Sequence, residues 1–202
     1  MKIVVIIPAR YGSTRFVGKP LELLEGKPMI QQVYERVNLP SIVKDIVVAT
    51  DDQRILDVVN GFGGNAIMTS KENRTGTDRV AEAAKKMGLN LNDIVVNIQG
   101  DQPKTHPQHL IDVVSPFRTD QGIEMSTLAF KIVKKDEITN PKDCKVTFDS
   151  RGYALYFSRS PIPCARDANT NFDTYKHLGI YAYTRRFLDI FRTLPEGTLD
   201  KI

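Results

Sequence analysis

Short runs of valine and isoleucine alternate with amphipathic segments through the first half of the chain. The apolar runs cover residues 3–7, 45–49 and 93–98. Because they lack the polar alternation of a half-exposed strand, they are typical of strands buried on both faces of a parallel sheet. The pattern therefore predicts a parallel sheet at the centre of the protein.

The segments between these runs have the spacing of amphipathic helices. In residues 28–39 apolar side chains recur at helical intervals, Pro28 suits a first helical turn and Pro40 closes the segment. Similar stripes occupy residues 55–59, 78–87 and 107–117. Alternating strands and helices predict a three-layer, doubly wound α/β fold, in which ligands bind beyond the carboxyl ends of the strands.

Beyond residue 124 the pattern changes to β-like pieces. They cover residues 125–132, 144–148, 153–158 and 178–183, and a helical stripe follows at 184–193. We expect these strands to join the same sheet, which makes it mixed, and to form an arm in residues 150–185. Since no low-complexity linker or internal repeat interrupts the chain, the sequence predicts a single domain over residues 1–202.

Composition narrows the class of protein. The 202 residues carry a formal net charge of +4, but the basic residues are dispersed and lack interleaved aromatics, so nucleic acid is not the expected partner. Cys144 and Cys164 have neither paired spacing nor clustered histidines, so neither a disulfide nor a zinc site is expected. No apolar stretch has the length of a membrane span or a signal sequence, so we expect a soluble cytoplasmic protein.

The most informative segment is residues 8–20, directly after the first apolar run. It reads PARYGSTRFVGKP and brings Arg10, Arg15 and Lys19 together with two glycines. Glycines let backbone N–H groups converge on an anion and the three cations supply full charge, so the segment predicts a phosphate-binding loop. A solvated surface turn with incidental charges is the alternative that composition leaves open.

Three familiar binding motifs have near matches in this sequence, and none of them is predicted to be functional. In residues 8–20, five residues and not four separate the two glycines, and a proline follows the lysine, so a Walker A loop is excluded. A dinucleotide-type pattern at residues 61–66 precedes an apolar run instead of joining a strand to a helix. The pair His106 and His109 has no third ligand in view, so it does not predict a metal site.

Together with four further blocks, the loop resembles the cytidylyltransferases that activate 3-deoxy-manno-octulosonate (Kdo) as its CMP derivative. The loop matches their PARxxSxRxxGKP signature, and the blocks fall in family order over nearly the whole chain. They are TGTDR at 75–79, NIQGDQP at 97–103, YALYFSR at 153–159 and KHLGIYAY at 176–183. The resemblance implies a nucleotide-diphospho-sugar transferase-like fold, CTP and an acidic keto-sugar as substrates, Mg2+ as cofactor and a homodimer.

In the resembling family the anomeric hydroxyl of the sugar attacks the α-phosphorus of CTP and pyrophosphate leaves, which feeds lipopolysaccharide biosynthesis. Such a transfer requires mainly positioning and charge neutralisation. The resemblance implies catalytic roles for Arg15, Lys19 and Asp101, with Asp101 as the Mg2+ ligand. It assigns the nucleotide to Pro8, Ala9, Arg10, Arg15, Lys19, Gly76, Thr77 and Arg79, and the sugar to Gln99, Arg159, His177 and Tyr181.

Several of these residues have purely structural alternatives. Asp101 follows a strand and a glycine, where a turn or helix-capping aspartate is ordinary. Thr77 serves equally well as a helix N-cap, and Gln99 as a plain strand-edge residue. For His177 a hydrogen-bonded role in the core is the alternative.

Three departures from the family pattern bear on activity. Phe16 and Val17 stand where the family has Leu-Pro, which removes a rigid backbone torsion beside the loop cations. Gln102 stands in place of the more usual glutamate, as in relatives that use an amino-substituted Kdo, so that sugar or another keto-acid sugar is an alternative substrate. Thr198 is predicted to be an N-cap, and the resemblance implies a further C-terminal segment after it that this sequence does not contain. A catalytically impaired CTP-binding remnant is therefore a further alternative.

Overall fold

The structure is a computed structural model that describes the chain except for residues 13–15, 39–40, 168–169, 196 and 198–202. Its contacts define two compact units, residues 1–126 with 180–202 and residues 127–179. Most of the arm expected in residues 150–185 belongs to the second unit. The cap proposed at Thr198 lies outside the described residues. None of the described helices combines the length and the apolar character that crossing a membrane requires.

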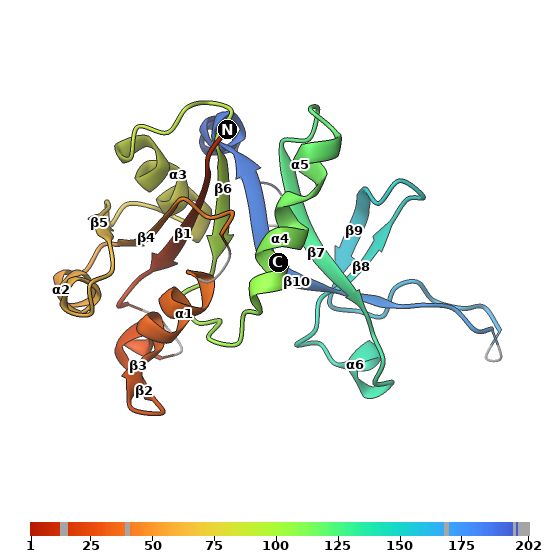
Figure 1. Cartoon of the computed structure of the whole chain (residues 1–202). Helices are drawn as coiled ribbons and strands as arrows, with labels where there is room; N and C mark the ends of the chain where they lie inside the picture. Colours follow the sequence, from red (N-terminus) through yellow and green to blue (C-terminus); the bar gives the residue numbers. More distant parts are fainter. Residues whose placement is uncertain (13–15, 39–40, 168–169, 196, 198–202) are drawn as a thin grey trace. The chain divides into compact units, whose positions relative to one another are not determined.

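A mixed sheet with the strand order β5-β4-β1-β6-β10 forms the centre of the first unit (Figure 1). Strand β1 (Ile3–Ala9) pairs in parallel with β4 (Asp45–Thr50) and with β6 (Ile94–Ile98), and β5 (Ala66–Met68) extends the parallel part. The second half of β10 (Tyr175–Thr184) pairs antiparallel with β6. The predicted parallel strands and the mixed character of the sheet are therefore confirmed.

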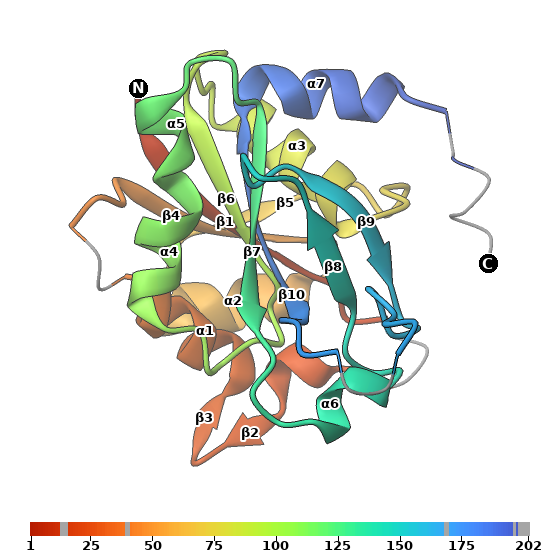
Figure 2. The same ribbon diagram turned by 90° about the vertical axis from the view of Figure 1, so that its right-hand side faces the viewer.

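Helices cover both faces of this sheet (Figure 2). On one face lie α1 (Met29–Val37) and α4 (Pro107–Val114), and on the other α3 (Gly76–Lys86) and α7 (Arg185–Thr193). Helix α2 (Gln53–Gly61) contacts β4 and β5. This is the three-layer α/β arrangement that the alternating pattern predicts.

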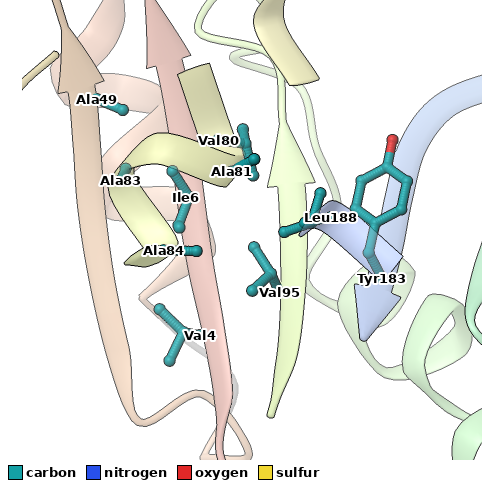
Figure 3. Close-up of a cluster of buried hydrophobic side chains, with 10 residues drawn as sticks. All are labelled: Val4, Ile6, Ala49, Val80, Ala81, Ala83, Ala84, Val95, Tyr183 and Leu188. Carbon is teal, nitrogen blue, oxygen red and sulfur yellow. The ribbon is translucent and has the colours of Figure 1, made fainter. Parts of the chain in front are cut away.

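The core under α3 and α7 shows why the central strands are apolar throughout. Val4 and Ile6 of β1 and Val95 of β6 point to this face and pack with Val80 of α3 and Leu188 of α7 (Figure 3). Their neighbours Val5 and Ile7 are also fully buried, because side chains along a strand alternate between its two faces. Both faces of β1 are thus removed from water, which fixes the position of its carboxyl end.

Two helix boundaries differ from the sequence prediction. Helix α3 begins at Gly76, because Thr75 is its N-cap: the Thr75 hydroxyl accepts from the Asp78 N–H at 3.1 Å, and the Asp78 carboxylate accepts from the Thr75 N–H at 3.0 Å. The alternative that made Thr77 the N-cap is wrong. The helix predicted over residues 107–117 is broken at Ser115 into α4 and α5 (Pro116–Thr119), since a proline has no N–H with which to continue a helix.

The two histidines near α4 form its N-terminal cap. Nδ1 of His106 accepts from the Gln108 N–H at 3.2 Å, and Nδ1 of His109 accepts from the His106 N–H at 3.3 Å. The Nδ1 atom of each histidine is therefore engaged with the backbone. The histidines satisfy N–H groups that a helix start otherwise leaves unpaired.

The remaining short elements of the first unit follow the first loop. Lys19–Leu21 forms one turn of 3-10 helix, and β2 (Leu23–Leu24) pairs antiparallel with β3 (Lys27–Pro28). None of these elements has enough residues to show a periodic pattern in the sequence.

The second unit contains antiparallel strands. Strand β8 (Lys145–Phe148) pairs with β9 (Ala154–Ser158) and with the first half of β10, and β7 (Met125–Lys131) also pairs with β10. A single turn of helix, α6 (Asp136–Thr139), precedes β8. Lys145 is fully buried here, and its Nζ donates to the carbonyls of Asn140 and Asp143 at 2.9 and 2.7 Å.

Candidate active site

Two cavities that share four lining residues lie beyond the carboxyl ends of β1 and β6. The larger has a volume of about 250 Å³ and the smaller about 180 Å³. The shared residues are Pro8, Ala9, Arg10 and Gln99. The site therefore lies at the edge of the sheet where doubly wound folds bind ligands.

Gly100 allows the two strand ends to approach each other closely. A Cβ at this position would lie 3.2 Å from the Pro8 carbonyl oxygen and 3.5 Å from the Ala9 Cβ. Any side chain would therefore push the turn after β6 away from the end of β1. The glycine keeps Gln99 and Asp101 beside the loop that follows β1.

Lys19 and Asp101 meet in the larger cavity. Lys19 Nζ lies 2.7 Å from Asp101 Oδ2, although the residues are 82 positions apart in the sequence. Both side chains are partly exposed, at 39% and 50%, so the pair adds little to stability and remains accessible to a ligand. The structure thus joins the predicted catalytic lysine to the predicted metal-binding carboxylate.

The other cations of the first loop are placed only in part. Arg10 is exposed and lines both cavities, as expected for a residue that binds phosphate oxygens. Arg15 lies outside the described residues, and its predicted role stays a prediction.

The smaller cavity is closed by the segment that leads into α3. Its lining includes Asn73, Arg74, Thr75 and Gly76 in addition to the shared residues. Gly76 was predicted, whereas Asn73 and Arg74 were missed because they precede the motif at 75–79 and have no periodic signal. The side chain of Arg74 is 60% exposed, and its Nε lies 3.8 Å from the Asp78 carboxylate.

Arg79 contributes to the smaller cavity but is already paired within the fold. Its Nη2 lies 2.7 Å from Asp51 Oδ2, and its Nη1 donates to the Thr69 hydroxyl at 2.5 Å. Only 4% of the side chain is exposed. The guanidinium therefore ties α3 to the ends of β4 and β5, and its predicted contact with nucleotide stays a prediction.

Thr77 is not a lining residue of either cavity. Its side chain hydrogen bonds to the hydroxyl of Tyr183 on β10. Burial raises the pKa of this tyrosine to about 12, in spite of the hydrogen bond. The side chain of Thr77 thus contacts the core, and its predicted contribution to nucleotide binding is not tested by this geometry.

Of the predicted sugar residues, Gln99 directly follows β6, and Tyr181 lies on the neighbouring strand β10 of the first unit. Gln99 lines both cavities, and its Nε2 donates to the Asn97 Oδ1 at 3.3 Å. Tyr181 pairs with Asn97 in the β6 to β10 ladder and stacks on Tyr183 with ring centroids 6.0 Å apart. Asn97 therefore neighbours both residues, Gln99 through its side chain and Tyr181 as its partner in the strand ladder.

The other two predicted sugar residues, Arg159 and His177, belong to the second unit. Arg159 is exposed and donates to the Pro141 carbonyl at 2.9 Å. His177 Nε2 lies 2.8 Å from the Thr127 hydroxyl, and its ring meets Phe157 edge to face at 5.0 Å. Burial lowers the pKa of the His177 imidazole, so the neutral ring is favoured. These contacts are compatible with either proposed role of the histidine.

A partly buried carboxylate, that of Glu82, fixes the segment that closes the smaller cavity. Burial alone would raise the pKa of Glu82, but hydrogen bonds from Lys86, Asn73 and the Ser70 N–H lower it to about 2. The pKa in the folded protein is thus below the ordinary value of 4.5. Its contribution to stability is present above that ordinary value and is lost as the pH falls towards 2.

We predict that Glu82→Gln lowers the free energy of unfolding at pH 7 by about 1–2 kcal/mol, less than the full pKa shift because Lys86 is half exposed and screened. Urea denaturation of both proteins between pH 7 and pH 2 measures the effect. The difference should shrink through this acid range. A constant difference would contradict the role given to the charge.

The geometry defines an α/β protein with a cation-lined cavity, suited to an anionic ligand, beyond the carboxyl ends of the parallel strands of a mixed sheet. Sequence similarity then shows the family: the model of the cytidylyltransferase family matches residues 4–202, and the chain belongs to this family. The protein is accordingly a nucleotidyltransferase enzyme.

Named relatives and a solved structure are similar over the whole chain. It is 63% identical over 202 residues to 3-deoxy-manno-octulosonate cytidylyltransferase of Desulfosudis oleivorans, a match that covers 100% of this chain and 82% of the relative. It is 51% identical over 203 residues to 8-amino-3,8-dideoxy-manno-octulosonate cytidylyltransferase of Shewanella baltica, with the same coverage. A structure of CMP:2-keto-3-deoxy-manno-octonic acid synthetase complexed with CTP matches at a TM-score of 0.92 and 43% identity, covering 100% of this chain and 81% of that one.

Proposed function

We propose that the protein transfers CMP from CTP to the anomeric hydroxyl of Kdo in the cytoplasm, giving pyrophosphate and CMP-Kdo for lipopolysaccharide biosynthesis. The ion pair between Lys19 and Asp101 carries the proposal, because it brings a cation from the loop region after β1 and a carboxylate from the turn after β6 into one cavity. Similarity over the whole chain to proteins named for this sugar supports the choice of substrate.

The cations that line the larger cavity suit the negative charge that this reaction builds up on phosphate. The bond from the sugar oxygen to the α-phosphorus forms as the hydroxyl releases its proton to solvent, while the bond to the pyrophosphate oxygen breaks, so negative charge builds up on the leaving group. Arg10 and Lys19 line the larger cavity and would neutralise phosphate oxygens, with Lys19 exchanging its Asp101 partner for phosphate. Positioning and charge neutralisation supply most of the catalysis in such a transfer.

The residues present fit one Mg2+ that is shared with the substrate. The Asp101 carboxylate is half exposed and lines the larger cavity, and Mg2+ commonly binds one or two carboxylates together with substrate phosphates. Among the described residues no group of three His, Cys, Asp or Glu side chains forms a complete cage. We propose that Asp101 holds Mg2+, which neutralises phosphate charge when it is bound.

Asp101→Asn should raise the Mg2+ concentration needed for half-maximal activity by at least about 10-fold, because an amide lacks the charge that attracts the ion. A Mg2+ titration of pyrophosphate release checks this. Asp57→Asn on α2 is the matched control, since Asp57 is exposed and lines neither cavity. An unchanged Mg2+ requirement in Asp101→Asn would remove the carboxylate from the metal site.

An amino-substituted Kdo is the second candidate substrate. Gln102 follows Asp101, and its side-chain Oε1 is buried without a hydrogen-bond partner in the described part of the chain. Gln102 lines neither cavity, and it bears on the choice of sugar as the residue that stands in place of the more usual glutamate. The relative named for the 8-amino sugar is also similar over the whole chain, which favours testing both sugars.

Pyrophosphate release from CTP and Mg2+ in the presence of Kdo, 8-amino-Kdo or a sialic acid tests the proposal. We expect release with Kdo and the highest kcat/KM for it. Preference for another sugar would reassign the substrate within the same chemistry. CTP binding without release with any sugar would identify a nucleotide-binding remnant and overturn the proposed activity.

We also propose that the protein acts as a homodimer through the second unit. Strand β9 and the residue before it expose large apolar side chains: Tyr153, Leu155, Tyr156 and Phe157 are each 41–67% exposed. Exposed apolar surface of this kind is typical of an interaction site. Light scattering should give twice the 22.7 kDa mass of the chain, and a monomer at micromolar concentration would contradict the dimer.

A further inference from the structure

The ring of Tyr11, directly after the loop residue Arg10, contacts two other parts of the first unit. The Arg54 Cζ of α2 lies 3.3 Å from the centroid of the Tyr11 ring. Gly18 also packs against this ring, because a Cβ on Gly18 would lie 3.1–3.2 Å from three of the tyrosine side-chain atoms. The tyrosine thus connects the two ends of residues 11–18 with helix α2.

The Asp52 carboxylate holds the side chain of Arg54 in place. Its Nε and Nη2 donate to the two carboxylate oxygens of Asp52 at 2.8 and 2.6 Å, and Asp52 also accepts from the Arg54 N–H as the N-cap of α2. A planar guanidinium fixed by a bidentate carboxylate presents its face to an aromatic ring. The N-terminus of α2 therefore supplies a fixed support for Tyr11.

The backbone completes the arrangement. The Gly18 N–H donates to the Tyr11 carbonyl at 2.9 Å, and Gly18 has φ +76°, a torsion that favours glycine. Arg10 immediately precedes Tyr11 and Lys19 immediately follows Gly18. The contact between Tyr11 and Gly18 therefore sets the separation of two cations that both line the larger cavity.

We propose that Tyr11 is a positioning residue for CMP transfer: its ring, supported by Arg54 and packed on Gly18, holds Arg10 and Lys19 at the spacing that the triphosphate requires. This inference rests on the proposed function, since it concerns the same cavity. Tyr11 and Arg54 themselves line neither cavity. Their effect on the reaction is therefore exerted through the loop cations.

The test compares Tyr11→Leu, Tyr11→Phe, Arg54→Leu and the double variant Tyr11→Leu with Arg54→Leu. Tyr11→Leu should lower kcat/KM for CTP by about 10- to 100-fold, the range expected when catalytic groups are displaced by about 1 Å. Tyr11→Phe keeps the ring and should retain most of the activity. Arg54→Leu should lower activity in the same direction, but it should have no further effect in the Tyr11→Leu background, because Arg54 acts through the ring.

Arg151→Leu is the matched control. Arg151 contacts the Asp149 carboxylate and lies over the Tyr153 ring at 5.1 Å, so it has the same combination of partners as Arg54, but it belongs to the second unit and not to the one that carries Tyr11. This variant should keep the kcat/KM for CTP of the unmodified protein. Unchanged thermal unfolding of all variants shows that the measured losses do not arise from loss of fold.

Hydrogen exchange of the Gly18 amide provides a readout that does not depend on turnover. It should accelerate in Tyr11→Leu and remain slow in Tyr11→Phe. Additive losses for Tyr11→Leu and Arg54→Leu, or unchanged exchange at Gly18, would overturn the inference. If the unmodified protein releases no pyrophosphate, the proposed function fails, and the exchange measurement still decides whether Tyr11 holds the loop.

Discussion

Lys19→Ala is expected to slow CMP transfer by about 10²- to 10³-fold, equivalent to about 2.7–4 kcal/mol of activation free energy, while CTP binding weakens far less. The physical reason is that the lysine ammonium opposes charge that is greatest when the bond to pyrophosphate breaks. Because other groups also bind the triphosphate in the ground state, the loss should fall mainly on kcat. Steady-state kinetics together with calorimetric CTP binding separate the two quantities.

Lys27→Ala is the matched control for this experiment. Lys27 forms an equally short ion pair, 2.7 Å from Glu35, and is similarly exposed, but it lines neither cavity. Its removal should leave both kcat and CTP affinity unchanged. Equal activity of Lys19→Ala and the unmodified protein would refute the role given to Lys19.

Arg79→Met is expected to lower the free energy of unfolding by about 3–5 kcal/mol, because it leaves the Asp51 carboxylate without its buried partner. The double variant Arg79→Met with Asp51→Leu should recover part of this loss, since no uncompensated charge remains. Urea denaturation measures both. A double variant less stable than Arg79→Met alone would contradict this explanation.

Lys131→Met shows how much stability is lost when an exposed ion pair is broken, for comparison with the buried pair of Arg79 and Asp51. Lys131 lies 2.7 Å from Asp173, but both side chains are at least half exposed, so its loss should cost no more than about 1 kcal/mol. CTP binding by the Arg79 and Asp51 double variant then tests the other predicted role of Arg79. Unchanged affinity in a folded double variant would limit Arg79 to structural support.

Some corrections to the sequence analysis have local physical causes. The start of α3 was placed too late because Thr75 and Thr77 are both suitable caps, and only the reciprocal hydrogen bonds of Thr75 with Asp78 distinguish them. The break between α4 and α5 follows from the missing N–H of Pro116, which an apolar stripe does not reveal.

Other contacts at the site could not be predicted from the sequence pattern. Asn73 and Arg74 line the smaller cavity, and Glu82, nine residues beyond Asn73, holds their segment against α3 through a hydrogen bond from Asn73. Arg54 and Tyr11 are separated by more than forty residues, and neither shows a signal of its own in the sequence. Contacts of this kind depend on how helices pack, and one chain without its fold does not specify them.

By itself the sequence determined the α/β class, the strands at the centre of the sheet and the cationic loop after the first of them, because apolar runs, helical spacing and glycines act locally. The tertiary structure alone decided that Lys19 meets Asp101, that Arg79 is occupied by Asp51 and that Tyr11 is supported by Arg54. These pairs form because parallel strands bring their carboxyl ends to one edge of the sheet, however far apart they lie along the chain.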